Sequence, residues 1–74
     1  MSARIIDGWL AVPYSGHDMA SVYLNVGGEW KPAFLDWHNG KRVAKVRFPA
    51  TASRSSSVVI RINDVETTVG RISA

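Results

Sequence analysis

Residues 22–48 read VYLNVGGEWKPAFLDWHNGKRVAKVRF, and this stretch decides the fold that we predict for the protein. Two turn signals, Gly27-Gly28 and Asn39-Gly40, divide it into three segments. Both pairs favour two-residue hairpin turns because they tolerate positive φ at both central positions. The pattern therefore predicts a three-stranded antiparallel meander formed by residues 22–26, 29–37 and 42–48.

The two turns also determine which side chains share a face, because side chains alternate between the two faces of a strand. One predicted face is mainly aliphatic: Val22, Leu24, Val26, Ala33, Leu35, Trp37, Ala44, Val46 and Phe48. The other face is mixed: Tyr23, Asn25, Trp30, Pro32, Phe34, Asp36, Val43, Lys45 and Arg47. A register slip of one residue would destroy this separation. We expect the first face to be the core and the second to be the candidate functional surface. In this register Phe34 lies across from Lys45, and Pro32 across from Arg47.

Two further hairpins flank the meander. Their predicted strands are residues 3–6, 9–12, 58–62 and 65–72. Asp7-Gly8 and Asn63-Asp64 are the turn signals. The cross-strand pairs expected in the second hairpin are Ile62 with Val65, Arg61 with Glu66, Ile60 with Thr67 and Val58 with Val69. The Arg61–Glu66 pair is of opposite charge, and Gly70 indicates a bulge or a sharp bend.

The spacing of these segments defines the fold class. Six or seven short strands follow one another at intervals of roughly ten residues, and no helical period is present. This predicts an all-β fold, a small antiparallel sandwich or an SH3-like barrel, built on the central meander. With 74 residues, the protein is expected to be a single domain, residues 1–74.

Composition excludes several classes of protein. The sequence has no Cys and two His, so neither a disulfide framework nor a structural zinc site is expected. The carboxylates show no metal-ligand spacing and no phosphate-binding Gly-rich loop is present, so we expect no metal and no cofactor. No apolar run approaches a membrane span and the N-terminus lacks a secretory signal. These features predict a soluble protein, cytoplasmic or virion-associated.

The charge distribution is asymmetric. The formal net charge is +3, and between Trp37 and Asn63 there are six basic residues and no acidic one: Lys41, Arg42, Lys45, Arg47, Arg54 and Arg61. Such a segment can attract a polyanion or an acidic protein. The alternative is that these charges keep a small β domain soluble and protect its edge strands.

Catalysis is not expected. Ser15, His17, Asp18 and Ser21 form a nominal Ser/His/Asp set, but all lie in one short loop. A hydrolytic triad takes its members from different elements that meet in a rigid pocket. We therefore predict that the protein is not an enzyme.

Two segments resemble known kinds of protein. The hairpin Val26-Gly27-Gly28-Glu29-Trp30-Lys31 resembles a Val-Gly-Gly-x-Trp-Lys phrase of phage tail and other virion proteins. This resemblance implies a role in a virion or in assembly. Residues 28–33, followed by Trp37, Asn39-Gly40 and residues 43–48, are similar to the central meander of SH3-like and Tudor-like small barrels. The sequence lacks the aromatic cage by which such barrels read methyl-lysine.

We predict a function in binding. The leading hypothesis is a protein-interaction or assembly module, for example a phage structural or accessory protein, with a protein partner or self-association. Its predicted partner-binding residues are Tyr23, Trp30, Phe34, Lys45 and Arg47, because aromatic residues and Arg dominate interface energies. No membrane and no small-molecule substrate is expected as a partner.

Three alternatives remain open. A nucleic-acid-binding barrel would stack bases on Trp30 and Phe34 and contact phosphates through Lys45, Arg47 and three further residues. Those possible phosphate contacts are Lys41, Arg42 and Arg54. A carbohydrate-binding module would use Trp9, Tyr14 and Trp30. Finally, the opening hairpin with Trp9 and Leu10 could cover the mixed face, which would then bind nothing.

Overall fold

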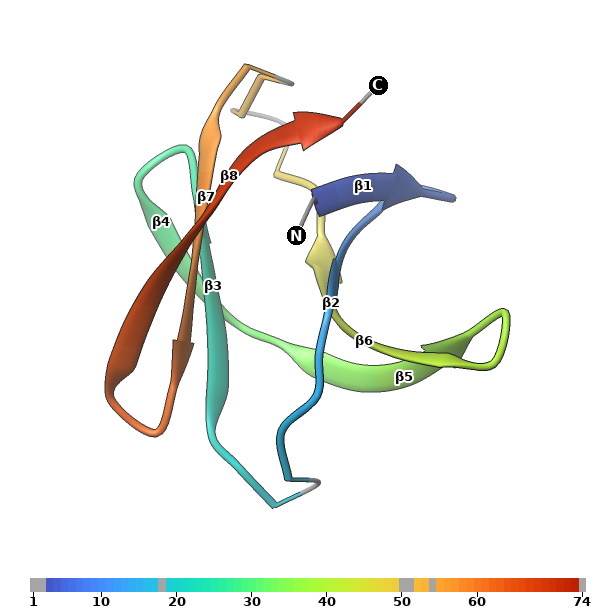
Figure 1. Ribbon diagram of the computed structural model, residues 1–74. Coiled ribbons are helices and arrows are strands. Elements are labelled where there is room, and N and C mark those ends of the chain that lie inside the picture. The colour runs from blue at the N-terminus through green and yellow to red at the C-terminus, as the bar shows by residue number, and fades with distance from the viewer. Residues whose placement is uncertain (1–2, 18, 50–51, 54, 74) are drawn as a thin grey trace.

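The computed structural model describes residues 3–17, 19–49, 52–53 and 55–73, and its regular structure is entirely β (Figure 1). The eight strands are β1 (Ala3–Ile6), β2 (Trp9–Pro13), β3 (Val22–Val26), β4 (Glu29–Pro32), β5 (Phe34–His38), β6 (Lys41–Arg47), β7 (Ser57–Ile62) and β8 (Val65–Ser73). The predicted all-β fold class is thus confirmed. Over the same described residues, no helix is long and apolar enough to cross a membrane.

The strands form consecutive hairpins, each closed by a two-residue turn: β1–β2, β3–β4, β5–β6 and β7–β8. Both central residues have positive φ in each of these turns, for example 51° at Asn39 and 77° at Gly40. The turn at Asn63-Asp64 has the same geometry without glycine, with φ of 47° and 71°. Positive φ at both central positions belongs to the turn type whose twist matches that of the strands. All of the predicted turns are therefore confirmed.

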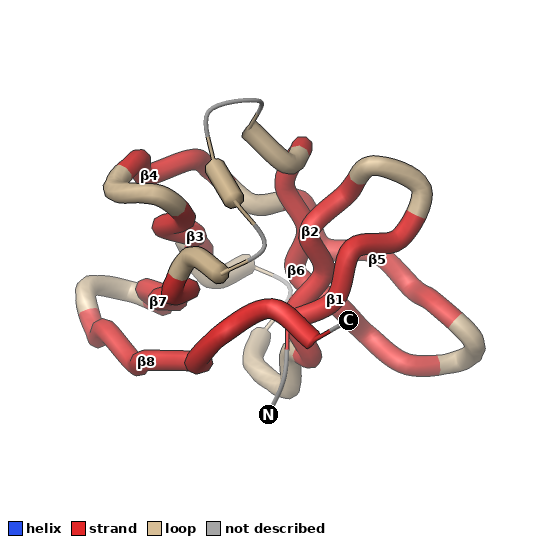
Figure 2. The backbone as a smooth tube through the Cα atoms, turned by 90° about the horizontal axis from the view of Figure 1, so that it is seen from above, coloured by secondary structure: helices blue, strands red, loops and turns tan. Residues whose placement is uncertain are grey.

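The hairpins lie side by side in one strongly curled sheet with the order β4-β3-β7-β8-β1-β2-β6-β5. Seen from above, β4, β3 and β7 lie on one side and β2, β6 and β5 on the other (Figure 2). The first and last strands of this order, β4 and β5, are consecutive in the sequence and are joined by Ala33. Neighbouring strands are antiparallel except β1 and β8, which pair in parallel through Ala3–Ile72 and Arg4–Ser73. The sheet therefore curls into a half-barrel.

The predicted strand 29–37 is wrong in one respect, because it is interrupted at Ala33. The Ala33 N–H donates a hydrogen bond to the Val22 carbonyl at 2.9 Å. Before it, β4 pairs with β3, and after it, β5 pairs with β6. The two halves of the segment thus belong to opposite ends of the sheet, which raises the number of strands to eight. Pro32 consequently lies across from Tyr23, and not across from Arg47.

The core lies inside the curled sheet and follows most of the predicted aliphatic face. Its fully buried larger side chains are Leu10, Val12, Leu24, Val26, Val46 and Val58. Trp37 is the exception, because 66% of it is exposed. It lies two residues before Asn39, near the end of the β5–β6 hairpin, which projects away from the other strands (Figure 1). The alternation of side chains correctly predicted the side of β5 on which Trp37 lies. It could not predict that the core ends before Trp37.

The C-terminal hairpin contains the predicted bulge. Ile62–Val65, Arg61–Glu66 and Ile60–Thr67 pair as expected. Val58, however, pairs with Gly70 and not with Val69, because the register shifts between Val58 and Val59. Gly70 has a φ of 110°, a conformation that residues with a side chain rarely adopt. The bulge prediction is confirmed, and the predicted Val58–Val69 pair is wrong.

Candidate binding surface

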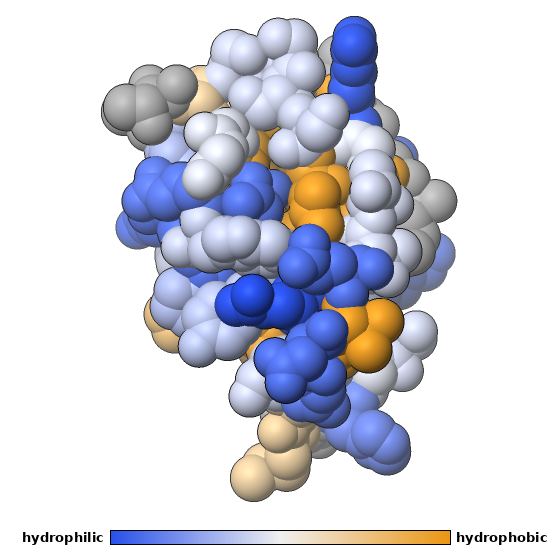
Figure 3. Space-filling view, turned by 90° about the vertical axis from the view of Figure 1, so that its left-hand side faces the viewer, coloured by the Kyte–Doolittle hydropathy of each residue, from blue (hydrophilic) through white to orange (hydrophobic). Residues whose placement is uncertain are grey.

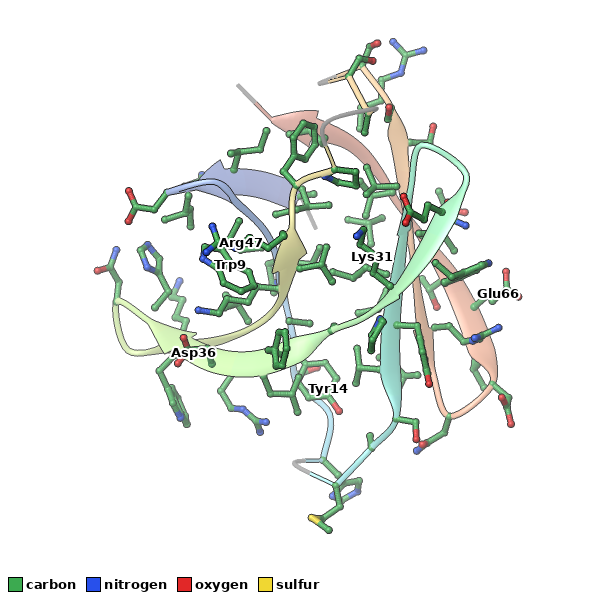
Figure 4. The ribbon with its side chains drawn as sticks, turned by 180° about the vertical axis from the view of Figure 1, so that it is seen from behind. Trp9, Tyr14, Lys31, Asp36, Arg47 and Glu66 are labelled. Atoms are coloured by element: carbon green, nitrogen blue, oxygen red, sulfur yellow. The ribbon has the colours of Figure 1, made fainter. Side chains whose placement is uncertain are left out.

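The bend at Ala33 divides the predicted mixed face between two sides of the molecule. Figure 4 shows Trp9, Arg47 and Asp36, which lie on β2, β6 and β5, on one side of the molecule. Glu66, on β8, lies on the opposite side of the view. We call the first group, Trp9, Phe34, Asp36, Lys45 and Arg47, the Trp9 face; it lies on β2, β5 and β6. We call the second group, Tyr23, Trp30 and Arg61, the Arg61 face; it lies on β3, β4 and β7.

The Trp9 face is centred on one indole ring. The register places Trp9 opposite Arg47 and Lys45 opposite Phe34, so these side chains leave the sheet on the same side. Lys45 Nζ lies 4.5 Å and Arg47 Cζ 4.6 Å from the centroid of the Trp9 ring. The Phe34 ring packs edge-to-face with Trp9 at a centroid separation of 6.1 Å. Cation–π and aromatic contacts of this kind hold the group in a defined arrangement.

Asp36 joins this group through Lys45. Lys45 Nζ donates a hydrogen bond to Asp36 Oδ2 at 2.7 Å, and the Trp37 backbone N–H donates to Oδ1 at 2.8 Å. The Lys45 hydrogen bond, followed by that of Trp37, lowers the pKa of Asp36 below its usual value of 3.8. Because the folded-state pKa is depressed, the stabilising effect of this carboxylate is present above the unfolded-state pKa. It is lost as the pH falls through the folded-state pKa.

Replacing Lys45 by glutamine is expected to raise the pKa of Asp36 back toward 3.8, because the largest cause of the shift is removed. A carboxyl ¹³C NMR titration between about pH 2 and about pH 6 would measure this change. Lys31→Gln is the matched control, since Lys31 contacts Glu29 at 3.7 Å and not Asp36. An Asp36 pKa that is unchanged in Lys45→Gln would contradict the assigned pairing.

Positive charge gathers on the outward side of the same strands. Lys41, Lys45 and Arg47 alternate along β6 and so share its outward side, and Arg4 of β1 lies opposite Ala11 of β2 on that side. Asp36 is the carboxylate that faces them across β5 and β6. Nearby, a hollow of about 210 Å³ lies between the Asp7 and His38 hairpin ends, with Ile6, Ala11 and Val43 among its lining. This side of the sheet combines cationic charge, exposed aromatic surface and a recess with both apolar and charged side chains in its lining.

The Arg61 face is built differently. Arg61 lies across from Tyr23 on the β3–β7 ladder, and Trp30 is on the next strand, opposite Asn25. Arg61 Cζ lies 5.0 Å from the Tyr23 ring centroid and 4.6 Å from that of Trp30. Figure 3 looks onto this side of the molecule, which is mostly polar with small apolar areas. The two distances show that the Arg61 guanidinium lies against both the Tyr23 and the Trp30 ring.

The predicted phosphate contacts occupy different settings. Lys41 is exposed beside the β5–β6 turn. Arg42 is half-buried: its Cζ lies 5.3 Å from the Tyr14 ring and 5.8 Å from the Trp37 ring, and its guanidinium donates to the Gly16 carbonyl at 3.4 Å. Arg54 lies outside the described residues. The structure thus gives Arg42 contacts within the protein.

The structure divides the predicted partner-binding residues between the two faces. Phe34, Lys45 and Arg47 belong to the Trp9 face, and Tyr23 and Trp30 to the Arg61 face. Sequence reasoning did not place Trp9 with Phe34, Lys45 and Arg47, or Arg61 with Tyr23 and Trp30. The alternation of Trp9 with buried Leu10 was a local signal that the ring points outward, but the pairing of β2 with β6 and of β3 with β7 is not local. Trp9 lies beside the predicted residues and does not cover Phe34, which is 61% exposed.

The three aromatic residues of the carbohydrate hypothesis do not form one exposed surface. Tyr14 is only 6% exposed, and its hydroxyl donates to the His17 carbonyl at 2.7 Å. Trp9 and Trp30 belong to the two different faces.

Of the nominal Ser/His/Asp set, Ser15, His17 and Ser21 are exposed, and Asp18 lies outside the described residues. Within the described part of the protein, no group of His, Asp and Glu side chains could hold a metal ion.

Comparison with protein-family models, with curated proteins and with solved structures found no match for this sequence.

Proposed function

We propose that this protein is a non-catalytic protein-interaction module that binds an acidic protein partner through the Trp9 face. The observation that carries the proposal is the exposed Phe34 ring, packed against a Trp9 ring that Lys45 and Arg47 hold in place. Aromatic and Arg side chains clustered on a rigid support are typical of interface hot spots. Because cation–π contact leaves the charge of Arg47 unneutralised, an acidic partner is favoured.

Exposed aromatic surface supports a protein partner in particular. Phe34 and Trp37 are both more than half exposed on β5, the last strand of the sheet order. Large apolar side chains in contact with water are a feature of interaction surfaces. Assembly into a virion, which the Gly27-Gly28 hairpin resemblance implies, and a cytoplasmic or virion location belong to this same proposal.

A displayed library of short peptides rich in Asp, Glu and aromatic residues would test the proposal. We expect selected peptides to lose about tenfold or more in affinity against Arg47→Glu and Phe34→Ala, since central interface residues contribute about 2 kcal/mol or more. The matched control is Arg71→Glu, which makes the same change of charge at an exposed position of β8. Equal loss in the control, or no selection of peptides that depend on Arg47, would contradict the proposal.

Nucleic acid is the second candidate, and the alternating cations Lys41, Lys45 and Arg47 on one side of β6 favour it. In that case a single-stranded oligonucleotide would bind with an affinity that falls steeply as salt rises from about 50 to about 200 mM. Charge reversal at Lys45 and Arg47 would abolish this binding. Oligonucleotide binding that survives both substitutions would exclude the Trp9 face as a nucleic-acid site.

A further inference from the structure

Arg61 is held in place by aromatic rings and not by its expected charge partner. Glu66 lies directly opposite it on the β7–β8 ladder, where an ion pair was expected. The guanidinium instead lies over Tyr23 and Trp30, at 5.0 and 4.6 Å from the ring centroids. Among the described residues, Arg61 and Glu66 form no ion pair. The position of the Arg61 side chain is therefore fixed by stacking.

Stacking leaves the hydrogen-bonding capacity of the guanidinium unused. Arg61 carries five N–H donors in its planar edge, and within the part of the protein that the structure describes none of them donates to a protein acceptor. The residue is half-buried, so its donors are partly shielded from water. A planar guanidinium that is already ordered loses little entropy when it donates to an oxyanion in a two-point contact.

Asn25 adds a second donor group on this side. It lies on β3 opposite Trp30, two residues from Tyr23, and its side chain is half-buried. No hydrogen bond involves its amide among the described residues. Diagonal neighbours on adjacent strands are within reach of long side chains. A ligand held by Arg61 could therefore also meet a neutral amide, beside two aromatic rings.

The local charge favours a ligand that carries a single negative charge. The cross-strand neighbours of Arg61 are Tyr23 and Glu66, and neither is a cation. Binding of a polyanion relies on a row of cations that neutralise successive phosphates. Such a row exists on β6 of the Trp9 face, whereas the described neighbours of Arg61 provide none. The Glu66 carboxylate would also oppose a doubly charged phosphate more than a carboxylate.

We propose that Arg61, stacked on Tyr23 and Trp30, binds one carboxylate of a protein partner, at a site separate from the Trp9 face. The carboxylate is that of an Asp or Glu side chain or of the partner's C-terminus. This site does not depend on the function proposed for the Trp9 face. A partner that engages both sides would contact the module at two points, which raises its apparent affinity without any further contact.

The test is an NMR titration of the intact protein, followed at the Arg61 Nε–Hε and Trp30 indole resonances. The probes are Ac-Gly-Asp-Gly-NH₂ for a side-chain carboxylate, Ac-Gly-Gly-Gly-OH for a C-terminal one, Ac-Gly-Asn-Gly-NH₂ as the neutral control, and inorganic phosphate. We expect saturable shifts with one or both carboxylate peptides, with a Kd on the order of 1–10 mM, and none with the neutral peptide. Saturation by only one of the two identifies the source of the carboxylate.

Two variants separate the site from general electrostatics. Arg61→Lys keeps the charge but removes the planar fork, and we expect it to weaken binding about fivefold or more. Arg71→Gln removes an exposed cation of β8 and should leave the titration unchanged. Stronger shifts with phosphate than with either carboxylate, no shift with either peptide, or equal loss in Arg71→Gln would overturn the proposal.

Discussion

Replacing Leu24 by alanine is expected to lower the free energy of unfolding by about 3–5 kcal/mol. Leu24 is completely buried at the centre of β3, between Lys31 of β4 and Ile60 of β7. Removing its branched end leaves a cavity, and neighbours on both sides are fixed by strand pairing, so the site cannot collapse freely. A domain of 74 residues has a small core, and such domains are only marginally stable. The variant should therefore be largely unfolded at physiological temperature.

Urea denaturation followed by tryptophan fluorescence would measure the loss, with the slope of the transition checked for two-state behaviour. Val65→Ala is the matched control, because it also shortens an aliphatic side chain on a strand but at a position that is 66% exposed. We expect the control to change stability by less than about 0.5 kcal/mol. A Leu24→Ala loss below about 1.5 kcal/mol would contradict the description of Leu24 as a fully buried core residue.

Local signals in the sequence predicted the hairpins well. Each turn is a pair of adjacent residues, and the pairs at Gly27-Gly28 and Asn39-Gly40 fix the register of the strands beside them. Because a two-residue turn leaves no freedom of register, pairs such as Leu35–Ala44 followed from counting alone. The inward face of β3 and β6 followed in turn from alternation.

The bend at Ala33 could not be predicted in the same way. Alternation continues through Trp30, Pro32 and Phe34, and a change in the direction of a strand does not disturb it. What divides the segment is the position of its partners, since β4 pairs with β3 whereas β5 pairs with β6. Those positions depend on contacts between hairpins that are distant in sequence. The side chains of the predicted mixed face therefore lie on two sides of the molecule.

The same reasoning explains why the neighbours of two site residues were missed. Arg61 lies against Tyr23 and Trp30 because β7 pairs with β3, although residues 27–56 separate these two strands in the sequence. Trp9 lies against Lys45 and Arg47 because β2 pairs with β6. In both cases the residue type and its outward orientation could be inferred locally, but its neighbours could not. In a protein built from hairpins, the composition of a surface is decided by the order in which the hairpins pack.

Substitution of Gly16 by alanine is expected to destabilise the protein by about 2–3 kcal/mol, although Gly16 itself is exposed. A Cβ atom at Gly16 would lie 2.7 Å from Cζ of the Tyr14 ring and closer still to its hydroxyl oxygen. Tyr14 cannot easily move away, because it is 6% exposed and packs in the core. Its hydroxyl donates to the His17 carbonyl, and Arg42 lies over its ring. Displacing Tyr14 would therefore cost packing and a hydrogen bond together.

A double-mutant cycle with Tyr14→Phe tests this cause. Removing the hydroxyl alone should cost about 1 kcal/mol, through loss of the bond to His17. In the Tyr14→Phe background the alanine at position 16 meets less obstruction, so its further cost should fall by about 1 kcal/mol. Ser15→Ala is the control for a neighbouring exposed loop position and should change stability by less than about 0.5 kcal/mol. Strictly additive losses from Gly16→Ala and Tyr14→Phe would show that the alanine at position 16 does not meet the Tyr14 hydroxyl.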